Sequence, residues 1–174
     1  MAFISISITK NHPLILGKGG FGCQLADWLS AEGWGEAEFL DDSAPGCVGG
    51  LRDYADPKLL KPGRPAFVAL GDNALRVELL QKLAAAGYDT PVFISDMAAV
   101  SPSAVLEPGC VILPQAYVGA DAHLGVGCII NGGAIVDHDA VLGRGVHVAP
   151  GGIVKAGAEV EALTKVDSGE IIKK

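Results

Sequence analysis

Residues 100–166 read VSPSAVLEPGCVILPQAYVGADAHLGVGCIINGGAIVDHDAVLGRGVHVAPGGIVKAGAEVEALTKV, and an aliphatic residue recurs in this stretch at every sixth position. A period of six fits neither a helix of 3.6 residues per turn nor the two-residue alternation of a strand. It suits a coil of three short strands, each of which turns a corner into the next. The repeated positions are Val100, Leu106, Ile112, Val118, Leu124, Ile130, Val136, Leu142, Val148, Val154, Val160 and Val166.

A second register of small residues supports the same architecture. The residue four positions after each aliphatic one is mostly Ala, Cys or Gly, so two residues per hexad are predicted to point inward. Dipeptides such as Pro108-Gly109 and Gly132-Gly133 supply flexible corners. The repeat predicts a parallel β-solenoid of fewer than four coils, about 18 Å tall at about 4.8 Å per coil. Such a short solenoid needs capping or oligomerisation.

The composition limits the partners and the compartment. The formal net charge of −7 argues against nucleic acid or an anionic membrane as a partner. The first residues lack the features of a signal peptide, and no segment has the length of a transmembrane span, so a cytoplasmic location is expected. The four cysteines form no metal or disulfide pattern, and Cys110 and Cys128, one coil apart, are expected to stack as reduced interior residues.

The N-terminal half begins with a strand at 13–16, followed by the glycine-rich turn GKGGFG at 17–22 and a helix over 24–31. Backbone N–H groups at such a helix start can face a phosphate, and the missing side chains allow close approach. A glycine run alone fits a phosphate site and a simple tight turn equally well.

The following segments favour a nucleotide site. A second strand at 37–40 ends in Asp41-Asp42, about twenty residues after the glycines, where an acidic residue commonly meets a ribose or base. A third strand at 66–70 leads through Gly71-Asp72-Asn73 into a helix over 74–86, and 91–95 is predicted as a fourth strand.

Strands that alternate with helices imply a small parallel sheet with a ligand crevice at the carboxyl ends of its strands. The fold class is therefore α/β plus β-solenoid. A Rossmann-like domain is expected in residues 1–97 and the solenoid domain in 98–174. The segment 2–10 can add an edge strand, although its role is open.

The combination of the two halves resembles the bacterial nucleotide-amino-sugar acetyltransferases, which comprise bacillosamine and perosamine N-acetyltransferases and the related sialic acid O-acetyltransferases. The resemblance rests on the turn 17–22, Phe39-Leu40-Asp41-Asp42, Ala69-Leu70-Gly71-Asp72-Asn73 and a hexapeptide repeat that carries His138-Asp139. It implies a left-handed β-helix, a homotrimer, acetyl-CoA as the donor, no metal, and a UDP-linked amino sugar held by the N-terminal domain as the acceptor.

The resemblance also assigns residues. It implies that His138 is the general base and that Asp139 raises its basicity, while His147 and Ala156 fall at the acetyl-CoA site. The contacts to the nucleotide sugar carry over onto Gly19, Gly20, Phe21, Asp41, Asp42 and Gly71.

The hexad frame adds a geometric prediction. His138 occupies an outward corner with Ala120 and Ala156 one coil away, which leaves room for a ligand. A histidine with a pKa near 6.5 suits removal of a proton from an amine during acyl transfer. His147 falls on the opposite face, and Tyr117, Ile135 and Ile153 stack into an outward apolar column. The active site is therefore predicted at a subunit interface.

Two departures from the family keep alternatives open. Phe21 stands where many relatives have a histidine, and the repeat is predicted to dissolve after Val160. The acetyl-CoA groove is then incomplete, reshaped or completed by a neighbouring subunit, with Lys165, Lys173 and Lys174 as candidate contacts to CoA phosphates. The rivals are a sialic acid type O-acetyltransferase, a non-catalytic nucleotide-sugar-binding protein, and a metal-dependent hydratase, for which His123, His138 and His147 are poorly spaced.

Overall fold

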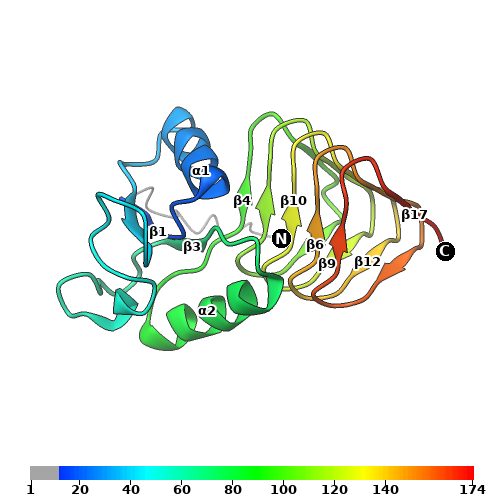
Figure 1. The fold of residues 1–174 in the computed structure, drawn as a ribbon. Coiled ribbons are helices and arrows are strands. Elements are labelled where there is room, and N and C mark those ends of the chain that lie inside the picture. The colour runs from blue at the N-terminus through cyan, green and yellow to red at the C-terminus, as the bar shows by residue number, and fades with distance from the viewer. Residues whose placement is uncertain (1–11) are drawn as a thin grey trace, which may run out of the picture.

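The computed structural model describes residues 12–174, in which a small α/β unit lies beside a three-sided parallel β-solenoid (Figure 1). The proposed edge strand at 2–10 lies outside the described residues. Within residues 12–174, no helix has both the length and the apolar character needed to span a membrane.

The α/β unit is a three-stranded parallel sheet between two helices. Strands β1 (Leu14–Leu16), β2 (Glu38–Leu40) and β3 (Ala66–Val68) lie in the order β2-β1-β3. Helix α1 (Gly20–Ala31) and helix α2 (Asn73–Ala86) cover opposite sides of the sheet, and a short 3₁₀ helix, η1 (Asp53–Ala55), lies in the connection from β2 to β3 (Figure 1). These three strands and two helices were predicted, although α1 begins four residues earlier than expected.

Alternation along the strands explains the two layers. In β1, Leu14 and Leu16 face the same side and pack in one cluster with Leu79, Leu80 and Leu83 of α2. Ile15 faces the other side, where it packs in a cluster with Leu25 and Leu29 of α1. Strands β1 and β3 are buried on both sides, as expected for a parallel sheet covered by helices, whereas Glu38 and Phe39 of the edge strand β2 are half-buried.

The solenoid has three parallel sheets, which we name after a central strand. They are the β10 sheet (β16-β13-β10-β7-β4), the β11 sheet (β17-β14-β11-β8-β5) and the β12 sheet (β15-β12-β9-β6). The strands are β4 Phe93–Ile94, β5 Ala99–Val100, β6 Val105–Leu106, β7 Val111–Ile112, β8 Tyr117–Val118, β9 His123–Leu124, β10 Ile129–Ile130, β11 Ile135–Val136, β12 Val141–Leu142, β13 His147–Val148, β14 Ile153–Val154, β15 Glu159–Val160, β16 Lys165–Val166 and β17 Ile171–Ile172.

The predicted interior of the solenoid is confirmed. The aliphatic and small positions of the hexads form one buried cluster, which includes Cys110 and Cys128 as free cysteines. Register partners such as Ile130 and Val148 are eighteen residues apart, which is one turn of three hexads. Each turn therefore repeats the inward pattern of the turn below.

Two predictions about the extent of the solenoid were wrong. Residues 93–94 form no fourth strand of the N-terminal sheet, because β4 pairs with β7. The repeat also continues past Val160 through β16 and β17, so the solenoid has four complete turns and two further strands. The physical reason is that Ile94 and Ile172 extend the six-residue ladder at both ends, while the polar Lys165 occupies an outward position that does not interrupt it. The boundary at 97/98 stays a prediction.

The corners follow a period of six as well. A positive φ angle occurs at every sixth residue from 109 to 169. Seven of these eleven positions are glycine, which adopts this conformation without steric cost, and the others are Gln115, Asp121, Asp139 and Leu163. Asp139 is therefore held in a left-handed conformation by the corner that it occupies.

Helix α1 joins the two parts of the molecule. Its residues Leu25 and Leu29 lie in one hydrophobic cluster with Phe67 of the small sheet and with Val111 and Ile129 of the β10 sheet. The outward side of the β10 sheet is thus part of a core shared with the α/β unit. His147 follows Ile129 in the same outward column, because the two residues are register partners.

Candidate active site

The glycine-rich turn is built by close backbone approach. Gly17 has a φ of +99°, and a Cβ atom there would lie 2.8 Å from the Ala69 carbonyl oxygen. A Cβ atom at Gly22 would lie 2.0 Å from the Gly17 carbonyl oxygen. The turn therefore requires glycine at both places, where β1 and β3 end side by side.

The start of α1 is open to a ligand. Gly19 is the N-cap residue, no side chain caps the helix, and Cβ atoms placed on Gly19 or Gly20 would meet nothing within 4 Å. The first N–H groups of a helix lack partners within the helix and attract anions. Residues 19–21 thus form a suitable cradle for a phosphate group.

Asp41 holds this turn in place. Its carboxylate accepts hydrogen bonds from the backbone N–H groups of Lys18 (2.8 Å), Ser43 (2.9 Å) and Ala44 (2.9 Å). These N–H groups, that of Lys18 first, keep the pKa of Asp41 well below its usual range. Asp41 therefore organises the loop as an ionised carboxylate, whether or not it also touches a ligand.

Asp42 and Gly71 lie at the ends of the neighbouring strands. Asp42 is exposed, and one of its oxygens accepts a hydrogen bond from the Leu51 N–H at 2.8 Å. Gly71 follows β3, is exposed, and has open space where a Cβ atom would lie. The structure thus places the glycine turn, both aspartates and Gly71 at the carboxyl ends of three parallel strands, as predicted.

His138 and Asp139 form an exposed pair on the corner between β11 and β12. His138 Nδ1 lies 2.7 Å from Asp139 Oδ2, and Asp137 Oδ1 accepts a hydrogen bond from the His138 backbone N–H at 2.8 Å. The hydrogen bond to Asp139 and the charge of Asp137 raise the pKa of His138. When Nδ1 carries the proton toward Asp139, Nε2 presents a lone pair.

Ala156 lies beside this pair. The N–H of the next residue, Gly157, donates to the His138 carbonyl oxygen at 3.0 Å, so the two corners stack. The predicted base and one predicted acetyl-CoA contact are therefore neighbours.

His147 lies elsewhere, on the outward side of the β10 sheet beside the glycine turn. Its ring centroid is 6.5 Å from that of Phe21, which comes from the first turn of α1. The corner with His138 and the β10 sheet with His147 are different parts of the solenoid surface. One chain thus brings His147 to Phe21 and His138 to Asp139 and Ala156.

Asn131 fixes the state of His147. The Asn131 Oδ1 atom accepts a hydrogen bond from the Gly132 N–H at 2.8 Å, which directs Nδ2 toward His147 Nε2 at 3.4 Å. Nε2 then accepts and Nδ1 carries the proton. Within residues 12–174, the buried Nδ1 atom has no hydrogen-bond partner. Burial, followed by the charges of Arg76 and Lys165, lowers the pKa of His147 to about 4, so His147 is neutral near neutral pH.

Sequence reasoning missed Asn131 and Arg76. Asn131 had a detectable signal, because the residues one turn away in its column are Leu113 and Ala149. A polar residue in an apolar column indicates a specific contact. Arg76 had no comparable signal, because its partners come from distant parts of the chain.

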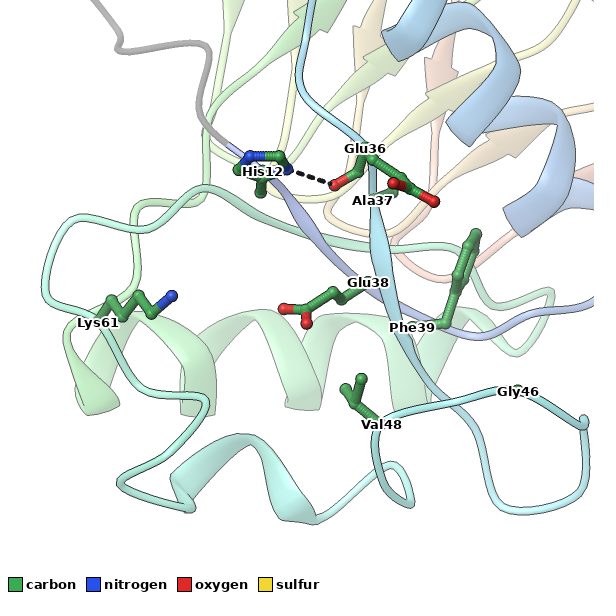
Figure 2. A pocket seen from close by; sticks show the side chains of 8 residues that line it. All are labelled: His12, Glu36, Ala37, Glu38, Phe39, Gly46, Val48 and Lys61. Atoms are coloured by element: carbon green, nitrogen blue, oxygen red, sulfur yellow. Dashed lines mark hydrogen bonds between the residues drawn. The ribbon is translucent and has the colours of Figure 1, made fainter.

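A cavity of about 500 Å³ lies along the outer edge of β2 (Figure 2), and two of its lining residues, Phe39 and Gly46, contact Lys18 of the glycine-rich turn. The side chains of Lys61 and Glu38 point toward each other across it, and His12 Nδ1 lies 3.1 Å from the Glu36 carbonyl oxygen (Figure 2). Its lining contains none of the predicted site residues.

Within residues 12–174, no group of three or more His, Cys, Asp or Glu side chains is arranged to hold a metal ion. His123, one of the three histidines weighed for a metal site, instead pairs with Glu107 at 3.0 Å.

The chain combines a parallel solenoid of hexapeptide repeats, which carries an exposed His–Asp pair, with a small α/β unit whose glycine turn and aspartates meet at the ends of its strands. This combination is typical of hexapeptide-repeat acyltransferases. Residues 14–83 match the family described as the PglD N-terminal domain. The acetyltransferase domain of PglB from Neisseria gonorrhoeae is 33% identical, with 93% of this chain and 87% of that chain covered and a TM-score of 0.77.

Two further similar structures are complexes with ligands. The same PglB domain in complex with acetyl coenzyme A has a TM-score of 0.75 at 33% identity, with 93% of this chain and 87% of that chain covered. A variant of the perosamine N-acetyltransferase from Caulobacter crescentus, in complex with CoA and GDP-perosamine, is 28% identical with a TM-score of 0.80, and 88% of this chain and 76% of that chain are covered. The chain belongs to the nucleotide-amino-sugar acetyltransferase family, and its solenoid is the left-handed β-helix of these enzymes.

Proposed function

We propose that this enzyme transfers the acetyl group of acetyl-CoA to the amino group of a nucleotide-linked amino sugar, with His138 as the general base. The observation that carries the proposal is the 2.7 Å contact between His138 Nδ1 and Asp139 Oδ2 on an exposed corner. That contact leaves Nε2 available for proton transfer and stabilises the imidazolium that forms.

In the proposed reaction, the acetyl group passes directly from acetyl-CoA to the sugar amine. The sugar amine attacks the thioester carbonyl carbon, and a C–N bond forms as the carbonyl oxygen takes the negative charge. His138 Nε2 removes a proton from the attacking nitrogen, the C–S bond breaks, and CoA leaves as a thiolate that takes up a proton. No protein nucleophile is needed, and Asp139 stabilises the protonated His138.

The two substrates are assigned to different residues. We propose that the diphosphate of the nucleotide lies against Gly19, Gly20 and Phe21 at the start of α1, with Asp41, Asp42 and Gly71 around it. His147 and Ala156 contact acetyl-CoA in this proposal. The described complexes with acetyl-CoA, CoA and GDP-perosamine support both substrate classes.

The nucleotide has two candidates. The resemblance in sequence favours a UDP-linked sugar, whereas the perosamine enzyme is described with a GDP-linked sugar. A panel of UDP- and GDP-linked amino sugars, assayed by release of free CoA, distinguishes them. If the enzyme acetylates a sugar hydroxyl group in preference to every amino group tested, it is instead an O-acetyltransferase of the sialic acid type.

We also propose a homotrimer with active sites at its interfaces. Tyr117, Ile135, Ile153 and Ile171 form an outward column on the β11 sheet. Ile153 is half-buried, and the other three are 43%, 36% and 46% exposed. Stacked exposed apolar side chains favour burial against a partner. This column adjoins the His138 corner, so a neighbouring copy that covers it can bring its own His147 and glycine turn toward His138.

The decisive variant is His138→Ala. Loss of a general base lowers the rate by about 10²- to 10⁴-fold. The His138 side chain is exposed and is not part of the solenoid core, so we expect a folded protein with kcat reduced by that factor. His123→Ala is the matched control, because His123 is also exposed and also pairs with a carboxylate. A His138→Ala enzyme as active as His123→Ala would contradict the assignment of the base.

A further inference from the structure

Arg76 is a buried cation that connects the two parts of the molecule. It lies in the first turn of α2 and is 1% exposed. Its guanidinium donates to three backbone carbonyl oxygens: Nη1 to Leu70 at 2.8 Å, Nε to Gly127 at 2.9 Å and Nη2 to Gly145 at 2.7 Å. One of these carbonyls belongs to the α/β unit and two belong to the solenoid.

The three acceptors border the proposed substrate sites. Leu70 directly precedes Gly71 at the carboxyl end of β3. Gly127 and Gly145 are corners one turn apart, and Gly145 lies two residues before His147. A neighbouring contact reinforces the link, because Asn73 Nδ2 donates to the Leu163 carbonyl oxygen at 2.8 Å.

None of the three hydrogen bonds of Arg76 goes to a carboxylate. All three acceptors are neutral carbonyls, and burial lowers the pKa of Arg76 to about 10, which still leaves it protonated near neutral pH. An apolar side chain of similar volume would fill such a position with less desolvation. Its three hydrogen bonds join the α/β unit to the solenoid, so it is the placement of these bonds, and not the buried charge alone, that points to a role beside the site.

We infer that Arg76 is a positioning residue that fixes the carboxyl end of β3 and the corner before His147 in one rigid frame. This inference rests on the proposed function, in which the nucleotide sugar binds beside Gly71 and the acetyl donor beside His147. The planar guanidinium suits the task because its donors point in fixed directions toward three separate acceptors. A lysine ammonium offers the charge without this geometry.

The charge also acts on His147. The groups that face His147 are Phe21 of α1, Asn131 after β10, Lys165 of β16, which pairs with Asp167, and Arg76 of α2. Burial is the main cause that keeps His147 neutral, and the charges of Arg76 and Lys165 add to it. His147 can then serve as a fixed hydrogen-bonding group while His138 carries the proton.

The test compares Arg76→Met and Arg76→Lys with Arg64→Met. Arg64 is the control, because it is also a buried arginine that donates to backbone carbonyls, but its contacts, which include an ion pair with Glu38, lie within the α/β unit. The chain has four histidines, so the ring signal of His147 can be assigned and titrated by NMR. KM is measured for both substrates, and thermal unfolding is followed for each variant.

We expect Arg76→Met to raise the pKa of His147 by about one unit, because a neighbouring positive charge is lost. Arg76→Lys should leave the pKa of His147 near the wild-type value, because the positive charge is kept. It should raise both KM values roughly tenfold, because the fixed directions of the guanidinium donors are lost. Arg64→Met should lower stability without either effect.

The inference is wrong if Arg76→Lys keeps both wild-type KM values, a result that is available even if Arg76→Met does not fold. It is also wrong if Arg76→Met folds but shifts the pKa of His147 no more than Arg64→Met does. The His147 titration needs no turnover, so a wild-type enzyme that transfers no acetyl group would contradict the proposed function alone.

Discussion

At the residue scale, the state of His138 is controlled by its two acidic neighbours. The hydrogen bond to Asp139 is the larger cause of the raised pKa of His138, and the charge of Asp137 is the second. The unprotonated ring is the form that acts as a base. Activity must therefore fall as the pH drops through the raised pKa of His138.

Asp139→Asn tests this control. The amide cannot stabilise the imidazolium, so the acidic limb of the kcat/KM profile should move to lower pH while the rate on the plateau falls by about tenfold or more. The measurement is kcat/KM from pH 5 to pH 9. The part of the pKa rise of His138 that comes from Asp139 should be absent from this variant, while the part that comes from the charge of Asp137 should remain.

Asp121→Asn is the control for the corner itself. Asp121 lies one turn below Asp139 and shares its positive φ angle, at 58° against 59°. An equal shift of the pH profile in this variant would show that surface carboxylates in general, and not the contact of Asp139 with His138, set the titration.

At the element scale, the corners of the solenoid differ in conformational strain. Gln115 and Gly133 occupy the same corner column, with φ angles of 62° and 67°. A left-handed conformation is unfavourable for a residue with a Cβ atom and free for glycine. Gln115→Gly should therefore stabilise the protein by about 1 kcal/mol, as measured by denaturant unfolding.

The reverse change provides the comparison. A Cβ atom at Gly133 would meet nothing within 4 Å, so Gly133→Ala should destabilise through backbone conformation alone, by about 1 kcal/mol. Equal stabilities for Gly133→Ala and the wild type would show that the corners tolerate side chains without strain.

The elements also show why some features were predictable from the sequence. The inward positions of the solenoid repeat every six residues because each turn stacks directly on the one below, so Val136 and Leu142 could be placed from the pattern alone. The strand at 93–94 was assigned to the wrong sheet because a short apolar run is compatible with either one. The sequence did carry a signal for the solenoid, because Ile94 lies six residues before Val100 and eighteen before its register partner Ile112.

The candidate site was predictable where it is local in sequence, and where it follows from parallel strands that end at one edge of the sheet. His138 and Asp139 are adjacent in sequence, and their corner position follows from the repeat. The contact between Phe21 and His147 joins residues 126 positions apart, so it depends on how α1 packs against the β10 sheet. The same is true of Arg76, whose three acceptors lie in two parts of the molecule.

At the scale of the whole molecule, the proposed trimer predicts complementation. His138→Ala and His147→Ala are each expected to be impaired as pure proteins. If a site combines His138 of one subunit with His147 of its neighbour, random mixed trimers contain intact sites at about a quarter of the interfaces. Co-expression of the two variants should thus restore about that fraction of wild-type activity.

The oligomeric state itself is measured by light scattering. Tyr117→Glu and Ile135→Glu place charges on the apolar column of the β11 sheet and should dissociate the trimer with loss of activity. A fully active monomer, or mixed variants with no recovery, would show that each subunit contains a complete site.

The cluster shared by α1, the small sheet and the β10 sheet has a consequence for folding. Neither part of the molecule can bury its apolar surface without the other, because Leu25 packs in the same cluster as Val111 and Ile129. The chain should therefore unfold as one cooperative unit. Fluorescence of Trp28 and Trp34, which report on the α/β unit, should change in the same transition as the β-sheet signal of circular dichroism, which reports mainly on the solenoid.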